Sequence, residues 1–242
     1  FTKHCGGAPI NIAAAAAKLG ARSKVLTQVG ADAFGDFILE TLSLCQVDIT
    51  AVKRTKQYPT ALAFVALDEK GNRDFTFYRD PCADLHLSAE DITATMFQDC
   101  GILHFCSVDL VDSPMKYAHL KAIQLAKEQS AVISFDPNVR LPLWSSEEDC
   151  KNNILEFAPY ADILKISDDE LFFLTGQKDW EHIFTVFPNA TIILLTCGKQ
   201  GSYLMTKKHH LYEKSIPVKA IDTTGAGDAF AAAFLKSEAK RS

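Results

Sequence analysis

The segment at residues 221–230, IDTTGAGDAF, concentrates residue types suited to chemistry on an anion. Gly225 and Gly227 let main-chain N–H groups approach a ligand closely, and a helix-forming apolar run follows at 229–235. The unpaired N–H groups and the positive dipole end of such a helix attract an anion, and Asp228 places a carboxylate beside it. The same residues would also suit a plain glycine-rich turn capped by Asp228. The segment alone leaves both interpretations open.

Two common nucleotide motifs do not explain this segment. No stretch of the chain has the G-x-x-x-x-G-K-[ST] spacing of a phosphate-binding loop. The dinucleotide fingerprint does not fit either, because the acidic residue sits within the turn and no strand with G-x-G-x-x-G precedes it.

Other polar clusters follow predicted strands, where ligands of open α/β sheets gather. They are DPNVR at 136–140, KISDDE at 165–170 and TCGKQG at 196–201, together with a Gly-Gly turn at 6–7 before Asn11 and a helix. Each cluster taken alone fits a surface turn or a helix cap. Together they are expected to converge on one edge of a sheet.

Helix and strand patterns alternate along most of the chain, as in α/β folds. Apolar periodicity and end signals predict helices at 11–19, 34–45, 114–129, after Ser146, and ending at Gly176. Strands are predicted at 24–29, 101–108, 131–135, 162–166, 191–196 and 202–206. Two further β-rich runs, 60–67 and 73–79, predict a hairpin. We therefore expect a mostly parallel sheet covered on both faces, with the hairpin as a separate small sheet.

Composition excludes several classes of protein. The 242 residues are 48% hydrophobic and 23% charged, as in an ordinary globular protein, and the longest apolar stretch, 12–17, is far below the roughly 20 residues that span a bilayer. The net charge is −5 without a Lys/Arg block, so neither nucleic acid nor a membrane is an expected partner. Seven scattered cysteines without a C-x-x-C pair indicate the cytoplasm rather than a disulfide framework or a zinc site.

Two signatures, GGAPINIAAAAAKLGA at 6–21 and DTTGAGDAF at 222–230, resemble those of the ribokinase-like (PfkB) carbohydrate kinases, and the resemblance extends over essentially the whole chain. Within that family, the stretches at 60–87 and 134–144 are most similar to fructokinases. The resemblance implies a three-layer α/β sandwich, with residues 1–50 and 83–242 as the core that binds nucleotide and sugar and 51–82 as a β lid. It also implies phosphoryl transfer from ATP to fructose, giving fructose 6-phosphate.

The resemblance assigns catalytic roles at the end of the chain. Asp228 would be the general base on the sugar hydroxyl, and the amides of Gly225, Ala226 and Gly227 would form an anion hole for the transferring phosphoryl group. A loose phosphoryl transition state needs alignment and charge stabilisation more than a strong base, which agrees with this assignment. Arg140 would lie near the nucleotide phosphates.

Ligand-binding residues are implied in the same way. The expected sugar ligands are Gly6, Gly7, Asn11, Phe77 and Arg79, and the expected nucleotide ligands are Asn138, Lys165, Thr196, Gly198, Lys199 and Gly201. Glu170 would bind Mg²⁺ through water, and Asp222 and Thr224 would help to hold a monovalent cation such as K⁺. The family pattern N-x-x-E is here S-D-D-E, so a serine, Ser167, replaces the asparagine.

The hairpin would close over the sugar as a lid that excludes water. With a two-residue period Phe75, Phe77 and Arg79 share one face, on which Phe75 is expected to pack against a partner lid while Phe77 and Arg79 face the sugar. Lid sheets of relatives often pair, so a homodimer through the lid is the assembly that the resemblance suggests.

Three alternatives remain open at this point. Other members of the family phosphorylate 2-keto-3-deoxygluconate or an aminoimidazole riboside or other nucleoside. The chain could also be an inactive homologue that only binds sugar or nucleotide, although Asp228 and the glycines argue against this. The third alternative is a dinucleotide-dependent oxidoreductase, and the missing dinucleotide fingerprint argues against it. Relatives also have a strand with a sugar-binding Asp before the Gly-Gly turn and helices after GDAF, so the chain is expected to be part of a longer protein.

Overall fold

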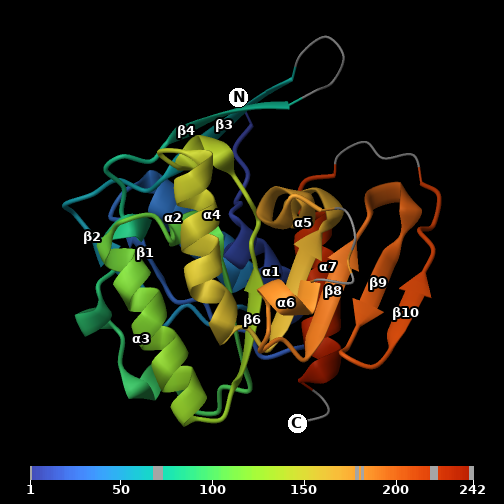
Figure 1. The fold of residues 1–242 in the computed structure, drawn as a ribbon. Helices are drawn as coiled ribbons and strands as arrows, with labels where there is room; N and C mark the ends of the chain where they lie inside the picture. Colours follow the sequence, from blue (N-terminus) through green and yellow to red (C-terminus); the bar gives the residue numbers. More distant parts are fainter. Residues whose placement is uncertain (1, 68–72, 178–179, 181–182, 219–222, 240–242) are drawn as a thin grey trace.

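Six strands form the main sheet of the computed structural model, which describes residues 2–67, 73–177, 180, 183–218 and 223–239 (Figure 1). The strand order is β10-β9-β8-β7-β6-β5. Four strands run parallel, namely β5 (Ile102–Cys106), β6 (Val132–Asp136), β7 (Ile163–Ser167) and β8 (Ile192–Thr196). β9 (Ser202–Met205) and β10 (His210–Glu213) continue the sheet in antiparallel pairing. The carboxyl ends of β5 to β8 therefore lie along one edge.

Alternate residues of the strands point to opposite faces, and each face is covered by helices. Ile102, Val132, Ile163 and Ile192 pack with α1 (Ala8–Lys18) and α7 (Ala226–Glu238) on one face. The other face packs against α3 (Pro114–Glu128), α4 (Glu147–Phe157), α5 (Asp168–Thr175) and α6 (Ile183–Val186). Figure 1 shows α3 and α4 in front of the sheet and α1 behind it. The result is three layers, helix, sheet and helix.

Two small sheets flank the main sheet. β1 (Thr27–Gly30) pairs in parallel with β2 (Val52–Thr55), and α2 (Ala33–Leu44) connects them. β3 (Leu62–Leu67) and β4 (Arg73–Tyr78) form the predicted antiparallel hairpin, with Ala63 opposite Phe77, and it projects at the top of Figure 1. The predicted turn between them, 68–71, lies outside the described residues.

Short 3₁₀ helices connect the longer elements. They are η1 (Asp84–His86), η2 (Ala89–Asp91), η3 (Ala94–Phe97), η4 (Ser107–Asp109), η5 (Leu141–Leu143), η6 (Ala158–Tyr160) and η8 (Gly198–Gln200).

The predicted α/β class and the mostly parallel sheet are confirmed. Helix ends agree where the sequence carries a cap, since the Ser146 hydroxyl accepts a hydrogen bond from the Asp149 amide and Gly176 ends α5 in the left-handed region. Two strands were missed, β2 and β10, because both are rich in charged or exposed side chains and lack an apolar alternation. β2 falls within the expected lid range, 51–82, but pairs with β1.

Candidate active site

The GAGD turn lies at the start of α7. Gly225 is the N-cap residue, with a φ of 75° that few residues with a side chain adopt, and Ala226, Gly227 and Asp228 form the first turn of the helix. The helix thus begins three residues earlier than the predicted start at 229, because the glycines enter the helix instead of forming a loop before it. The Ala226 amide donates to the Thr223 carbonyl at 3.2 Å. The amide of Gly227 lies among those for which a helix offers no partner of its own.

A hydrogen bond joins the two signatures at the ends of the chain. Nδ2 of Asn11, in α1, donates to Oδ2 of the buried Asp228 carboxylate at 2.8 Å. The bond requires α1 and α7 to pack side by side, which their apolar faces do through Ile12, Ala231 and Leu235. The Gly-Gly turn reaches α1 with Gly7 as N-cap at a φ of 111°. One oxygen of Asp228 is fixed in this way.

A buried ion pair lies beneath this turn. Nζ of Lys165, in β7, lies 3.1 Å from Oδ2 and 3.3 Å from Oδ1 of Asp136, the last residue of β6. A Cβ atom added to Gly227 would lie 3.3 Å from the same Nζ, so glycine leaves room for the lysine directly under the helix start. The arrangement brings an ammonium group and the positive end of a helix dipole to one place, which favours an anion there.

Burial governs the electrostatics of these groups. It raises the pKa of Asp136 to about 7, with Glu170 and Asp228 adding to the rise and Lys165 opposing it. Burial would lower the pKa of Lys165, but the charges of Asp136 and Glu170 outweigh it and the pKa is raised. The lysine therefore keeps its proton at neutral pH. Its charge also adds to burial in lowering the pKa of His104, in β5, to about 4.

Glu170 connects two of the predicted clusters. Its Oε2 accepts hydrogen bonds from the amide and the hydroxyl of Ser167, while the Ser167 hydroxyl accepts one from the Glu170 amide. Its Oε1 accepts a hydrogen bond of 2.9 Å from the Val139 amide in the DPNVR stretch. The serine that departs from the family pattern therefore forms a capping box, and Glu170 ties the loop after β6 to the start of α5.

The DPNVR loop places its two polar side chains differently. Asn138 is buried with a φ of 43°, and its main-chain N–H donates to Oδ1 of Asp136 at 3.1 Å. Arg140 is exposed, and its Nη1 donates a hydrogen bond of 2.8 Å to the Val139 carbonyl. A guanidinium placed in this way keeps most of its donors available for a phosphate.

Arg79 lies one residue beyond β4, and the exposed Tyr78 separates it from Phe77 along the chain. Its side chain is largely buried and forms ion pairs with Asp84 and Asp109. Phe77 lines the main cavity of the molecule, as does Arg79. The side chain of Phe75, for which contact with a partner lid was predicted, lies outside the described residues.

One cavity, of about 2820 Å³, brings most of the predicted residues together. Its lining includes Gly6, Gly7, Asn11, Phe77, Arg79, Asn138, Arg140, Lys165, Glu170, Thr224, Gly225, Gly227 and Asp228. Five predicted residues are not among those that line it, namely Thr196, Gly198, Lys199, Gly201 and Ala226. The first four follow the carboxyl end of β8, whose Thr196 pairs with Ser167 of β7, and therefore lie beside the cavity along the same sheet edge. Asp222 lies outside the described residues.

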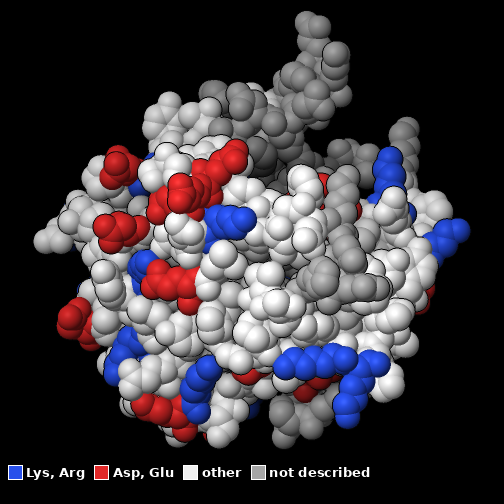
Figure 2. All heavy atoms as spheres, viewed as in Figure 1, with Lys and Arg blue, Asp and Glu red and all other residues white. Residues whose placement is uncertain are grey.

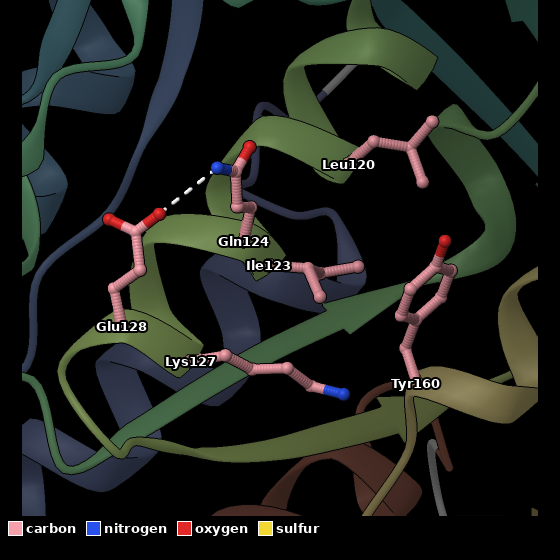
Figure 3. Close-up of a pocket in the computed structure, with 6 residues that line it drawn as sticks. All are labelled: Leu120, Ile123, Gln124, Lys127, Glu128 and Tyr160. Atoms are coloured by element: carbon pink, nitrogen blue, oxygen red, sulfur yellow. Dashed lines mark hydrogen bonds between the residues drawn. The ribbon is translucent and has the colours of Figure 1, made fainter.

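A second hollow lies at the opposite ends of the strands. It is lined by Leu120, Ile123, Gln124, Lys127, Glu128 and Tyr160 (Figure 3). The end of α3 leads into β6 there, and Tyr160 precedes β7, so this hollow faces the amino ends of the sheet. In it Gln124 donates to Glu128 and the Lys127 ammonium lies over the Tyr160 ring. Ligands of open α/β sheets bind at the other edge, where the predicted residues gather.

The surface adds little to the choice of ligand. Figure 2 shows acidic and basic side chains interspersed on the face that it presents. Within the described residues, no helix combines the length and the apolar character needed to cross a membrane. The same residues contain no group of three or more His, Cys, Asp or Glu side chains able to hold a metal ion.

Comparison with known proteins settles the family. The model of the pfkB family of carbohydrate kinases matches residues 1–241. The chain belongs to the PfkB family of carbohydrate kinases. This kinase is 41% identical over 238 residues to fructokinase-2 of Solanum habrochaites, with 97% of this chain and 73% of the relative covered. Fructokinases are therefore among its similar curated relatives.

Solved structures agree with the family. The fructokinase of Xylella fastidiosa with bound ATP has a TM-score of 0.92 and 32% identity, with 98% of this chain and 74% of that chain covered. The fructokinase of Vibrio cholerae O395 with fructose, ADP and calcium has a TM-score of 0.88 and 36% identity, with 97% of this chain and 76% of that chain covered. The ribokinase-like fold predicted for this PfkB kinase is confirmed by these neighbours.

Sequence reasoning missed several polar residues of this PfkB kinase that the structure places at or beside the site. Asp136 was noted only as part of its loop, and His104, Asp84 and Asp109 were not singled out. A charged or imidazole side chain inside an apolar strand, as in ILHFC and VISFD, is the signal that would have found two of them. The partners of Arg79 leave no such signal, because they come from separate loops.

Proposed function

We propose that the protein is an ATP-dependent kinase that phosphorylates D-fructose at a terminal hydroxyl, giving fructose 6-phosphate. The observation that carries the proposal is the Asp228 carboxylate, held by Asn11 at the start of α7 beside Gly227 and Lys165. The fructokinase relatives and the neighbour with bound fructose and ADP support this sugar. Among the described residues, no feature of the site favours a nucleoside or another substrate over fructose.

In the proposed mechanism Asp228 accepts the proton of the sugar hydroxyl through its second oxygen, because Asn11 occupies Oδ2. The sugar oxygen then bonds to the γ-phosphorus of ATP as the bond to the leaving ADP oxygen breaks. The amides of Gly225, Ala226 and Gly227 and the Lys165 ammonium stabilise the charge on the transferring group. For Ala226 to take part, its amide would release its bond of 3.2 Å to the Thr223 carbonyl, which is at the long end of the usual range.

The nucleotide would extend from this point along the sheet edge. Arg140 and Asn138 line the cavity, while Thr196 ends β8 and Gly198, Lys199 and Gly201 follow it. The exposed guanidinium of Arg140 suits the terminal phosphates, and the glycine-containing turn of η8 suits a close approach of the nucleotide.

Ions are proposed on the chemistry of the donor set. Mg²⁺ keeps several waters and takes phosphate oxygens, so it needs few protein ligands, and Glu170 is a carboxylate that lines the cavity and is not the proposed base. Each Glu170 oxygen already accepts a protein hydrogen bond, so contact through an ordered water fits better than direct coordination. A K⁺ site is proposed from Thr224 and Asp222, and a potassium-bound form of the Vibrio cholerae fructokinase mutant supports it.

We propose that residues 51–82 act as a lid on the core formed by 1–50 and 83–242, and that a homodimer forms through the lid. The exposed apolar residues Phe64, Val65 and Tyr78 on β3 and β4 support pairing. The seven free cysteines support a cytoplasmic location, because oxidising compartments favour disulfides.

A coupled ATPase assay tests the proposed function. The panel contains D-fructose, ribose, 2-keto-3-deoxygluconate, aminoimidazole riboside and adenosine, each with ATP and Mg²⁺. D-Fructose should give the highest kcat/KM. If ribose or a nucleoside were better by about tenfold, equal to about 1.4 kcal/mol, the kinase activity would stand and the fructose assignment would fall. ATP consumption without any dependence on sugar would contradict both.

A further inference from the structure

Arg79 is held by carboxylates from two separate core segments. Its Nε and Nη2 donate to Oδ2 of Asp84, in η1, at 2.9 and 2.6 Å, and Nη2 also donates to Oδ1 of Asp109, in η4. Its Nη1 donates to the Val108 carbonyl at 2.7 Å. Three of its nitrogens are thus engaged, and two carboxylates share one guanidinium.

The cluster is enclosed and belongs to the cavity already described. Arg79 and Asp109 each expose 13% of their side chains and Asp84 exposes 20%. All three line the cavity that also holds Asn11 and Asp228. At this depth charges are weakly screened, so their sum is felt by a ligand. One guanidinium and two carboxylates sum to a net charge of −1.

This sum affects which sugars the cavity can accept. A sugar acid such as 2-keto-3-deoxygluconate carries a carboxylate that needs a charged or hydrogen-bonding partner once it is removed from water. Four of the five Arg79 N–H donors are taken, and the net charge of the Arg79, Asp84 and Asp109 cluster repels a further anion. A neutral ketose needs no such partner and meets carboxylate oxygens that can accept hydrogen bonds from hydroxyls.

We propose that Asp84 and Asp109 are specificity-determining residues, which occupy the Arg79 guanidinium so that the site accepts uncharged sugars and rejects sugar acids. The inference rests on the proposed sugar kinase function and deepens it by naming the class of sugar. Asp84 and Asp109 act through Arg79 and do not need to touch the reacting atoms.

The test is the ratio of kcat/KM for D-fructose to kcat/KM for 2-keto-3-deoxygluconate in single variants. Asp84→Asn and Asp109→Asn each keep the size of the side chain but remove one negative charge, so the ratio should fall by at least about tenfold. Asp36→Asn is the matched control, because Asp36 pairs with Arg54 at an exposed site outside the cavity. Its ratio should stay at the wild-type value. Folded variants whose ratio also stays there would overturn the proposal.

A binding measurement on the wild-type protein keeps the proposal testable if the variants do not fold. By calorimetric titration without ATP, 2-keto-3-deoxygluconate should bind at least about tenfold more weakly than D-fructose. Affinities within about threefold of one another would overturn the inference. Failure of the proposed kinase function would give a different result: the wild-type protein would bind fructose more tightly than the sugar acid but would not phosphorylate it.

Discussion

Asn11 and Asp228 are 217 positions apart in the chain, yet the Asn11 amide donates a hydrogen bond of 2.8 Å to Oδ2 of the Asp228 carboxylate. The resemblance to PfkB kinases predicted that Asn11 binds the sugar. The structure gives its amide nitrogen a second task, because the bond fixes the rotamer of the proposed base and leaves the other carboxylate oxygen for the substrate. Asn11 therefore positions the group that performs the chemistry.

Asn11→Leu should lower kcat/KM by about ten- to a hundredfold, because a hydrogen bond to a charged group contributes about 1.5–3 kcal/mol. Steady-state kinetics with fructose and ATP measure the change, and the KM for ATP should stay the same. Asn153→Leu is the matched control, since Asn153 makes the same amide-to-carboxylate bond to Asp149 on α4, and turnover should be normal. Equal losses in both variants would contradict a specific role.

Asp228→Asn should lower turnover by at least roughly 10²–10⁴-fold, the usual contribution of a positioned general base. The amide is nearly isosteric but cannot accept the proton, so nucleotide affinity measured by titration should change little. Asp36→Asn makes the same change in the first turn of α2 and should leave turnover intact. Wild-type turnover in Asp228→Asn would remove Asp228 from the mechanism.

Arg140→Met should weaken catalysis while the fold stays intact, because the exposed guanidinium bonds to the neighbouring Val139 carbonyl and not to a distant element. The variant keeps the aliphatic bulk of the side chain and loses the charge that would contact phosphate. Thermal unfolding and kcat/KM for ATP measure the two effects. Arg54→Met removes another exposed arginine as a control. If Arg140→Met unfolded and its soluble fraction had normal ATP kinetics, Arg140 would be structural.

Local signals in the sequence were enough for the framework of the fold. The capped helices α4 and α5 and the apolar strands of the main sheet follow from nearest-neighbour chemistry, and so were predicted close to their observed bounds. β10 was missed because its side chains are all exposed, so only its pairing with β9 makes it a strand. Tertiary context supplies such a strand, and local propensity does not.

In the site, too, local motifs were predictable and contacts between distant elements were not. Its motifs were visible because several polar clusters follow strands and helix starts together, although the glycine-rich helix start alone left two interpretations open. The partners of Arg79 and Lys165 were not predictable, since Asp84, Asp109 and Asp136 are brought to them by loops and strands far apart in the chain. A sequence indicates which residues can carry charge, while the pairs that neutralise that charge depend on how the elements pack.

Lys165→Met should destabilise the protein by up to about 3–5 kcal/mol, because the buried Asp136 carboxylate must then stay without its partner or take up a proton. Denaturant unfolding at pH 8 measures the loss. The double variant Lys165→Met, Asp136→Asn removes the uncompensated charge and should recover most of the stability. A single variant as stable as wild type, or a double variant no better than the single, would show that the pair carries little of the stability.

His104→Asn should change how stability depends on pH. Burial and the Lys165 charge lower the pKa of folded His104 to about 4 from an ordinary 6.5, so between these values the unfolded state binds more protons and stability rises with pH. Asp136, with its pKa raised to about 7, contributes the opposite slope, so the difference between wild type and variant isolates His104. That difference in unfolding free energy should grow by up to about 1.4 kcal/mol per pH unit between about pH 4 and pH 6.5. Ser134→Ala is the control, because it removes the 2.9 Å contact of the Ser134 hydroxyl with Nδ1 of His104 but keeps the imidazole, and it should retain the wild-type slope. If the stability difference between wild type and His104→Asn did not change with pH, His104 would have the same pKa in the folded and unfolded states.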